Sequence, residues 1–402
     1  MTERSTNICL RILSLSYFTM GTGTLAIVGT LPEIAASLSL ERGAVAMLVS
    51  VLAVTFAVSA PGLQMVAGQW PRRTLILIGL ALMAVGAFGT ALAPNYAVLL
   101  AARVCAGLGA AAIGPVASAL GASLVAQERQ GHALAVVFSG MTIASVLGVP
   151  LSAWGGASLG WRPTFALIGV ATLIVAGLIA ILVDNREGGE RVRPSDLAAI
   201  AGRLATAAGI AVMVLEMSGV FVTYTMITLI LRDRFGAGPE AVSTALMIFG
   251  LAGIGGNYVA RWVSQRWSAN RAVTVALTTL TLVFATLFLA PAWYPAALAL
   301  LIVWATASDL FMPSQQRRMV ELAPEARGLV LALNSSAIYV GMAAGSFTAS
   351  TLYPVFGLSS LPLASINFLA LAFAALALSS RAAAMPDRQR KISCPIEPDF
   401  PI

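Results

Sequence analysis

Several stretches of this chain are too long and too apolar to belong to a water-soluble domain. No Asp, Glu, Lys or Arg occurs at positions 43–71, 272–308 or 328–380. Only 10% of the residues are charged and 58% are apolar, whereas a soluble domain carries about 25% charged residues. The chain therefore cannot cover itself with a polar surface, which excludes a cytosolic enzyme, a DNA-binding protein and a disulfide-held secreted domain.

Charged residues and turn signals divide the apolar stretches into membrane spans. A transmembrane helix needs about 20 residues, so the chain has room for about a dozen. The two longest charge-free stretches each contain a turn signal, Pro291 to Pro295 in one and Tyr353-Pro354 with Gly357 in the other. We expect an all-α membrane protein with twelve spans, at residues 12–34, 44–66, 74–93, 98–124, 134–157, 164–183, 205–231, 241–262, 273–290, 296–314, 328–350 and 361–380.

Basic residues are concentrated on one side of this topology. An even number of spans places both termini on the same side, where 19 of the 24 Lys and Arg residues fall, against four in the opposite loops. The positive-inside rule then makes both termini cytoplasmic. We expect a multi-pass protein of a bacterial-type inner membrane, with the first span retained as an anchor. The +7 net charge reflects this bias, so no nucleic-acid partner is expected.

One polar loop divides the chain into two halves. Residues 184–204 form the longest such loop and lie between spans six and seven. We expect a six-helix bundle at residues 1–183, this cytoplasmic inter-bundle loop at 184–204, a second six-helix bundle at 205–380, and a cytoplasmic tail at 381–402. The polar, proline-containing tail is expected to be disordered.

Distinctive short segments occur in both halves: Gly21 to Thr24 and Gly29 to Ala35, Arg103 to Ala111, Ser139 to Thr142, Gly148 to Leu151, Gly160 to Phe165, Ala323 to Ala326 and Ala332 to Asn334, with Gly341, Ala344 and Gly345. These motifs resemble those of the major facilitator superfamily, over residues 15 to 380. The resemblance is to its twelve-span drug:proton antiporter branch, and within it to the arabinose-efflux-like and purine-nucleoside-efflux-like proteins. It implies the major facilitator fold, in which two six-helix bundles are built from inverted repeats. It also implies proton-coupled efflux of a small molecule (a drug, sugar, nucleoside or metabolite) by alternating access.

Two departures from the family pattern leave alternatives open. The family often places an acid in the first span just after the Gly-Thr pair, where this chain has Gly23 and Thr24. A facilitator or proton symporter of a small polar solute is therefore the alternative. The loop after span two has Gly68 in place of the family's acid and keeps only Arg72 and Arg73. These arginines either form a conformational latch or follow the positive-inside rule.

Three charged residues lie well inside predicted spans: Arg103, Glu216 and Asp309. A charge at mid-bilayer costs about 2.5–3.5 kcal/mol on insertion scales, so each is a functional candidate. The resemblance implies that their spans, the fourth, seventh and tenth, line the central cavity. We expect Glu216 or Asp309 to take up a proton, and Arg103 to offset their charge or meet a polar substrate. The alternatives are a packing role for Glu216, contact of Asp309 with the cytoplasmic vestibule, and helix pinning through carbonyls by Arg103.

Other intramembrane residues give weaker indications. Candidates for lining the substrate cavity are Tyr17, Thr22, Thr24, Tyr224 and Tyr339. An isolated aromatic residue in a span serves packing or interface anchoring at least as often. Small residues let helices approach closely in lipid, and proline permits a bend. We therefore assign packing or hinge roles to Gly107, Gly109, Gly140, Gly148 and Pro150.

The sequence offers little for chemistry or metal binding. His132 is the only histidine and no cysteine pair accompanies it, so no metal site or catalytic relay is expected. No phosphate-binding G-x-x-x-x-G-K-[ST] motif occurs, so we expect no cofactor and a proton gradient as the driving force. We predict a small-molecule substrate, protons and the bilayer as partners, a monomer, and no enzymatic activity. A transport-inactive membrane sensor is the alternative of another class, although its loops would be short for signalling.

Overall fold

The computed structural model describes residues 3–126, 129–184, 194–289 and 292–384. Within these ranges, twelve helical segments are long and apolar enough to cross a membrane, which confirms the predicted number. Ten spans are single helices: α1 (Glu3–Ser37), α2 (Arg42–Ala67), α3 (Arg72–Ala91), α4 (Tyr96–Ser123), α7 (Trp161–Leu182), α11 (Pro239–Ser264), α12 (Ala269–Leu289), α13 (Tyr294–Leu322), α14 (Arg327–Phe356) and α15 (Leu361–Ala384).

The fifth and seventh spans are interrupted. Span five consists of α5 (Gln130–Ile143), the π-helical segment η2 (Ala144–Gly148) and α6 (Val149–Ser158). Pro150 is the second residue of α6, just after η2, and it has no amide hydrogen to donate to the preceding turn, which favours such an irregularity. Span seven consists of α9 (Leu204–Tyr224), α10 (Ile227–Leu229) and the π-helical η3 (Ile230–Arg234). The predicted span at 205–231 is confirmed, since Leu204–Arg234 forms one membrane span, and a turn at residues 225–226 interrupts its helix.

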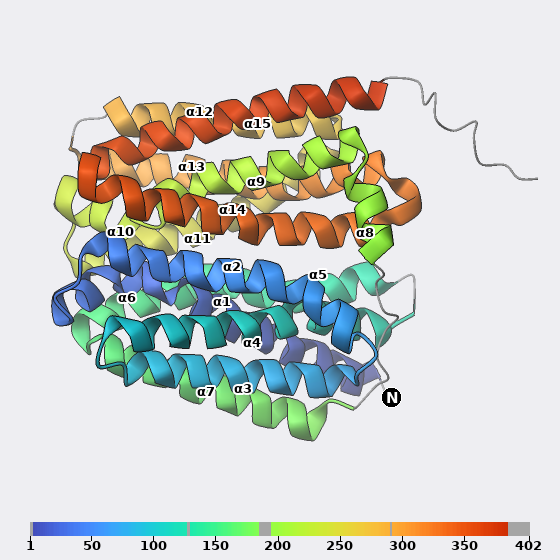
Figure 1. Ribbon diagram of the computed structural model, residues 1–402, viewed down its shortest axis with the longest axis horizontal. Coiled ribbons are helices and arrows are strands. Elements are labelled where there is room, and N and C mark those ends of the chain that lie inside the picture. Colours follow the sequence, from blue (N-terminus) through green and yellow to red (C-terminus); the bar gives the residue numbers. More distant parts are fainter. Residues whose placement is uncertain (1–2, 127–128, 185–193, 290–291, 385–402) are drawn as a thin grey trace, which may run out of the picture.

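The helices form two groups, with α1–α7 in one half and α9–α15 in the other (Figure 1). A further short helix, α8 (Pro194–Ala201), lies in the connection between them. Residues 184–204 are therefore not simply a loop, because proline suits the first position of a helix and leucine and alanine favour its continuation. The remainder of that connection at 185–193 and the predicted tail beyond residue 384 lie outside the described residues.

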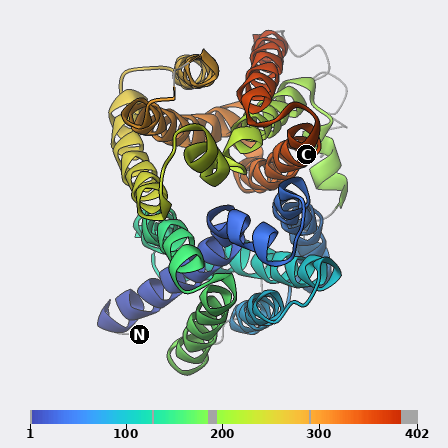
Figure 2. The same cartoon turned by 90° about the vertical axis from the view of Figure 1, so that its left-hand side faces the viewer.

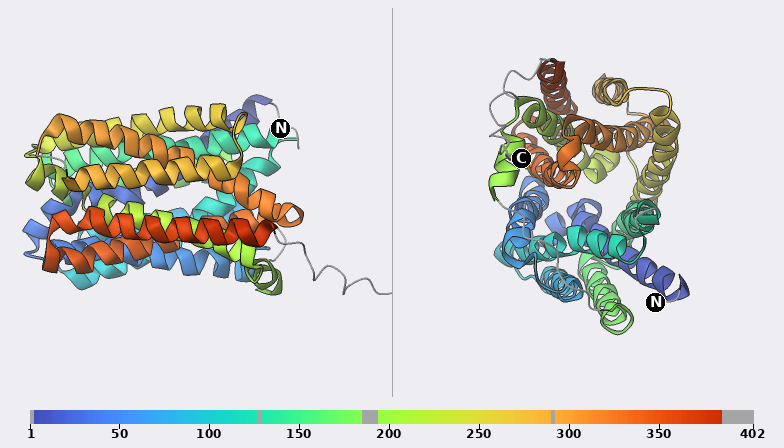
Figure 3. Two further views of the ribbon diagram at one scale, coloured as in Figure 1. Left: turned by 90° about the horizontal axis from the view of Figure 1, so that it is seen from above. Right: turned by 90° about the vertical axis from the view of Figure 1, so that its right-hand side faces the viewer.

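Residues 3 and 384 lie at the same end of the molecule, which we call the terminal end, and the opposite end is the distal end (Figure 1). The halves meet along two seams (Figures 2 and 3). In one, α2 packs on α14, and in the other α6 and η2 pack on α11. α5, the part of span five toward the terminal end, makes little contact with α11. The halves are therefore packed together toward the distal end and diverge along α5.

Polar contacts cross between the halves toward the distal end. Ser50 donates to the Ala343 carbonyl at 3.1 Å. Two ion pairs join helical segments of opposite halves, Arg232 of η3 to Glu33 of α1 at 2.5 Å and Arg42 of α2 to Asp233 of η3. Because these contacts must break if the halves separate at this end, they stabilise the distally closed state. Two further hydrogen bonds cross the interface, Thr228 to the Val28 carbonyl at 2.9 Å and Ser243 to the Pro150 carbonyl at 2.8 Å.

Candidate functional site

Glu216 is the most deeply buried acid in the described part of the chain. It lies on α9, twelve residues after the helix begins at Leu204, and its side chain is 0% exposed. Neither carboxyl oxygen has a hydrogen-bond partner among the described residues. A buried carboxyl without a partner costs far less as the neutral acid than as the anion. Glu216 therefore has the environment of a group that exchanges a proton.

Asp309 on α13 is the second buried acid and interacts electrostatically with Glu216, so two negative charges here would repel. Asp309 is only partly buried and accepts a hydrogen bond from the Asn257 side chain of α11 at 2.9 Å. α11 approaches α13 closely at this point, since a Cβ at Gly256 would lie 2.8 Å from the Asp309 Cβ. We call Glu216 and Asp309 the acid pair.

A cavity of about 240 Å³ leads from the terminal end to the partner of Asp309. It lies between α11, α12 and α13, and Asn257 forms part of its lining. Arg261 and Arg317 line it as well, and both side chains are exposed. Water in this cavity can reach the amide that holds Asp309, so the acid pair lies close to a polar route toward the terminal end.

More buried polar groups lie about two turns from the acid pair, around Gly209 of α9. Gln315 is 0% exposed and donates to the Gly209 carbonyl at 2.7 Å. A Cβ at Gly341 of α14 would lie 2.5 Å from the Val214 carbonyl oxygen of α9. Asn334 is seven residues before Gly341, so it lies about two turns nearer the terminal end, level with Gly209. Asn334 is 0% exposed, and its side-chain amide has no hydrogen-bond partner among the described residues.

These amides extend the polar region beyond the residues that the sequence singled out for proton transfer. Asn334 entered only through a family motif, and Gln315 and Asn257 carry no charge that marks them in a hydropathy pattern. Gln315 contacts α9, and Asn257 contacts α13. Both contacts form only because helices distant in sequence pack together.

Arg103 lies in the other half, on α4, and is 1% exposed. Its guanidinium donates to the carbonyls of Gly23 and Thr24 at 2.9 and 2.8 Å, and to that of Leu48 at 3.4 Å. It therefore ties α4 to α1 and α2. These contacts favour helix pinning over the alternative in which Arg103 offsets the charge of the acid pair.

The five predicted cavity residues are not brought to one place. Thr22 lines a groove between α1, α6 and α7. Thr24 donates to the Met20 carbonyl of its own helix at 2.7 Å. Tyr17 donates to the Gly114 carbonyl at 2.7 Å and contacts the Phe138 ring edge-on. The two threonines thus face different neighbours from the same helix, and a substrate-binding role for either stays a prediction.

The other two tyrosines, Tyr224 and Tyr339, each contact aromatic side chains. Tyr339 on α14 stacks on Phe56 of α2, with ring centroids 3.4 Å apart. Tyr224 contacts Phe249 and Trp304, with ring centroids 5.4 and 6.2 Å away. Tyr339 thus lies between the halves, whereas Tyr224 belongs to an aromatic cluster inside the second half.

The small residues assigned to packing lie where helices approach closely. A Cβ at Gly107 would lie 2.8 Å from the Leu52 carbonyl oxygen, and one at Gly109 would lie 2.7 Å from Met83 Cγ. Gly140 lies against the Ser14 carbonyl and Gly148 against Thr22 with no room for a Cβ. Arg72 donates to the Ala119 carbonyl at 2.7 Å and Arg73 to the Val183 carbonyl at 3.2 Å, so both bind the terminal-end carbonyls of neighbouring helices.

Comparison with known proteins gives the family. The sequence profile described as "Major Facilitator Superfamily" matches residues 13–346 and, in a second match, residues 208–393. The chain belongs to the major facilitator superfamily. Members of this superfamily that resemble it in sequence include the inner membrane transport protein YdhP of Escherichia coli (strain K12), 29% identical over 85% of this chain and 87% of that protein. A chloramphenicol resistance protein of Streptomyces lividans is 32% identical over 85% of this chain and 88% of that protein.

Solved structures of the superfamily share this fold. A bacterial homolog of the human lysosomal transporter Spinster, in an inward-facing and unoccupied conformation, matches 96% of both chains with a TM-score of 0.72 and 15% identity. A D-xylose-proton symporter matches 92% of this chain and 96% of its own with a TM-score of 0.73 and 16% identity. The protein is therefore a multi-pass secondary transporter with the major facilitator fold.

Proposed function

We propose that this protein exports a small molecule across the inner membrane in exchange for protons, with Glu216 as the group that carries the proton. The observation that carries the proposal is the buried carboxyl of Glu216, without a hydrogen-bond partner and beside a second acid. An ionisable group inside a membrane bundle is costly, and a role in proton transfer accounts for that cost.

In this proposal the two acids have different roles in coupling proton movement to transport. Asp309 lies next to Asn257, and the cavity that contains Asn257 gives protons access from the terminal end. Glu216 lies deeper and is sealed from solvent in the distally closed state. Repulsion between the two carboxylates favours protonation of at least one of them, so loading of one group influences the other. This arrangement replaces the acid that the first span lacks.

The direction of transport rests on sequence relatives. One relative is named a chloramphenicol resistance protein, and another, from Haemophilus influenzae (strain PittGG), a probable sugar efflux transporter, 23% identical over 87% of this chain and 88% of its own. The second name states efflux of a sugar, and the first states resistance to a small-molecule drug, which export would provide. A drug, sugar, nucleoside or other metabolite is therefore the proposed substrate class.

The proposal includes the molecular setting. Both termini face the cytoplasm, so the distal end faces outward and the ion pairs there close the outer side. The protein acts as a monomer in the bilayer, binds no nucleic acid, uses no cofactor or metal, and performs no chemical conversion. The proton gradient supplies the free energy.

Transport by reconstituted protein tests the proposal. Proteoliposomes with an acidic lumen are mixed with chloramphenicol, arabinose or inosine, and uptake is followed with and without nigericin and valinomycin in potassium buffer. We expect uptake of one of these classes that the ionophores abolish, because an exchanger accumulates substrate against outward proton flow. Accumulation with an alkaline lumen instead would identify a symporter, and gradient-independent equilibration would identify a facilitator.

A further inference from the structure

The cavity of about 240 Å³ between α11, α12 and α13 has a basic lining. Arg261 and Arg317 contribute two guanidinium groups, and the first turn of α12, which begins at Ala269, adds the partial positive charge of a helix N-terminus. Arg317 is paired with Glu321 at 2.8 Å, whereas Arg261 has no ion pair within the described part of the chain. The cavity therefore carries a positive charge that favours an anion.

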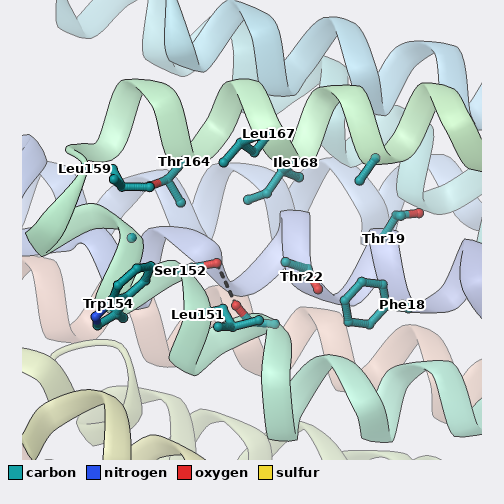
Figure 4. A pocket seen from close by; sticks show the side chains of 13 residues that line it. Phe18, Thr19, Thr22, Leu151, Ser152, Trp154, Leu159, Thr164, Leu167 and Ile168 are labelled. Carbon is teal, nitrogen blue, oxygen red and sulfur yellow. Dashed lines mark hydrogen bonds between the residues drawn. The ribbon is translucent and has the colours of Figure 1, made fainter. Parts of the chain in front are cut away.

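This lining is a feature of the second half and not of both halves. The corresponding position of the first half, between α2, α3 and α4, has a cavity of only about 50 Å³. There Arg72 donates to the Ala119 carbonyl at 2.7 Å. The groove between α1, α6 and α7 is larger, but none of its lining residues is charged (Figure 4). A basic cavity of this size thus distinguishes the terminal end of α11, α12 and α13.

The surroundings of the cavity match the level of lipid head groups. Trp262, the neighbour of Arg261 in sequence, is 53% exposed, and tryptophan is enriched where the apolar interior of a membrane meets its head groups. α11 and α12 both pack on α13 but make little contact with each other. Val303 lies eleven residues before Ser314 of the lining, on the same face of α13 about three turns away, and is 44% exposed. The basic cavity therefore continues into an apolar surface.

We propose that this cavity binds the phosphate of an anionic phospholipid, whose acyl chains lie along α13 between α11 and α12. Basic pockets between transmembrane helices bind anionic lipid head groups, and a guanidinium group can donate two parallel hydrogen bonds to phosphate oxygens. A zwitterionic phospholipid has the same phosphate but also an ammonium group, which the arginines repel. Inorganic phosphate has the same oxygens but gains nothing from the apolar surface.

The site adjoins the acid pair. Asn257 belongs to the same lining and donates to Asp309. Because arginine charge beside a conducting path opposes the entry of protons, a phosphate bound at Arg261 would ease proton access to Asp309. This consequence rests on the proposed function, whereas lipid binding itself does not.

Native mass spectrometry of the full-length, delipidated protein tests the site. The protein is titrated in a non-ionic detergent with dioleoylphosphatidylglycerol, and separately with dioleoylphosphatidylcholine, which has the same acyl chains and no net charge. We expect the first phosphatidylglycerol to bind at a concentration about tenfold lower than the first phosphatidylcholine. Arg261→Gln should raise the half-saturating phosphatidylglycerol concentration about tenfold, the effect of losing hydrogen bonds from a charged donor.

A matched variant separates this site from the general basic surface. Arg266→Gln removes the same charge from an exposed arginine that stacks on Trp262 at 4.3 Å and lies outside the cavity lining. Because salt screens exposed charges that make no direct contact, this variant should bind phosphatidylglycerol within about twofold of the parent protein. Arg261→Lys keeps the charge and should bind more tightly than Arg261→Gln, although less tightly than the parent.

Equal weakening by Arg261→Gln and Arg266→Gln would overturn the proposal in favour of diffuse surface attraction. Equal affinity for the two lipids would overturn it as well. Displacement of phosphatidylglycerol by an equal concentration of inorganic phosphate would instead assign the cavity to a soluble anion. The assay measures binding without transport, so failure of this proposal and failure of proton coupling are separate results.

Discussion

Phe56 and Tyr339 stack across the interface between the halves, with ring centroids 3.4 Å apart and planes inclined by 16°. The pair joins α2 to α14 in the seam that also contains the Ser50 hydrogen bond. Stacking of this kind contributes about 0.5–1.5 kcal/mol beyond the buried area. Because the rings belong to opposite halves, this free energy stabilises the distally closed state.

Phe56→Ala should therefore shift the population away from that state by about twofold to tenfold. Spin labels at the exposed residues Glu41 and Phe356 report the distance between the distal ends of α2 and α14. We expect longer distances in Phe56→Ala, whereas Tyr339→Phe, which keeps the ring and loses only the hydroxyl, should resemble the parent protein. Identical distance distributions in all three proteins would show that the stack does not close this end.

The Glu33–Arg232 ion pair should act in the same direction. Its side chains are only 16% and 22% exposed, so solvent screens the pair less than a fully exposed one. Arg232→Glu should reduce the distally closed population about fivefold, corresponding to about 1 kcal/mol, and adding Glu33→Arg should restore much of it. Glu321→Arg is the control, because it breaks the ion pair with Arg317 inside α13. That pair does not connect the two halves, so the distance between the spin labels at Glu41 and Phe356 should stay unchanged. Failure of the double variant to recover would contradict this account.

Arg103 should determine stability rather than coupling. Arg103→Met removes three hydrogen bonds that join α4 to α1 and α2, and we expect unfolding to become easier by about 3 kcal/mol. Arg103→Lys should recover only part of this, because an ammonium group cannot reproduce the geometry of the guanidinium. Thermal unfolding in detergent, followed by tryptophan fluorescence, measures the change. A variant as stable as the parent but without proton-driven transport would instead assign Arg103 to coupling.

Asn257 should position Asp309 for proton exchange. Asn257→Ala removes the 2.9 Å hydrogen bond to the carboxyl, and we expect proton-driven exchange to fall about tenfold while substrate exchange without a gradient persists. The ratio of the two rates, measured in proteoliposomes, is the diagnostic quantity. Ser264→Ala alters the same cavity without touching Asp309 and should keep the ratio. Equal loss of both rates in Asn257→Ala would indicate a merely structural role.

Much of the fold could be predicted from the sequence, because the need to match charge-free stretches to bilayer thickness acts locally. The break at residues 225–226 could not, since no proline or glycine marks it. Similarly, Arg318 lies outside the span predicted at 296–314, yet it is 4% exposed within α13 and donates to the Ser379 hydroxyl at 2.6 Å. Its burial depends on Ser379 of α15, which is 61 residues away in the sequence.

The candidate site likewise contains residues that could be predicted from the sequence and residues that could not. A charge inside a span is visible in a hydropathy pattern, so Glu216 and Asp309 could be singled out. Asn257 and Gln315 could not, because uncharged amides in helices acquire meaning only from the atoms they meet. The groove that Thr22 lines could not be predicted either, because position along α1 does not reveal which face of the helix a residue occupies.

Proton movement coupled to substrate exchange tests the central claim most directly. Proteoliposomes that hold a pH-sensitive dye are given the transported substrate, and proton flux is compared for the parent protein, Glu216→Gln and Glu240→Gln, the last being the same change at an exposed acid. We predict that Glu216→Gln still exchanges substrate for substrate but moves no protons, while Glu240→Gln behaves as the parent. Unchanged proton flux in Glu216→Gln would contradict the account.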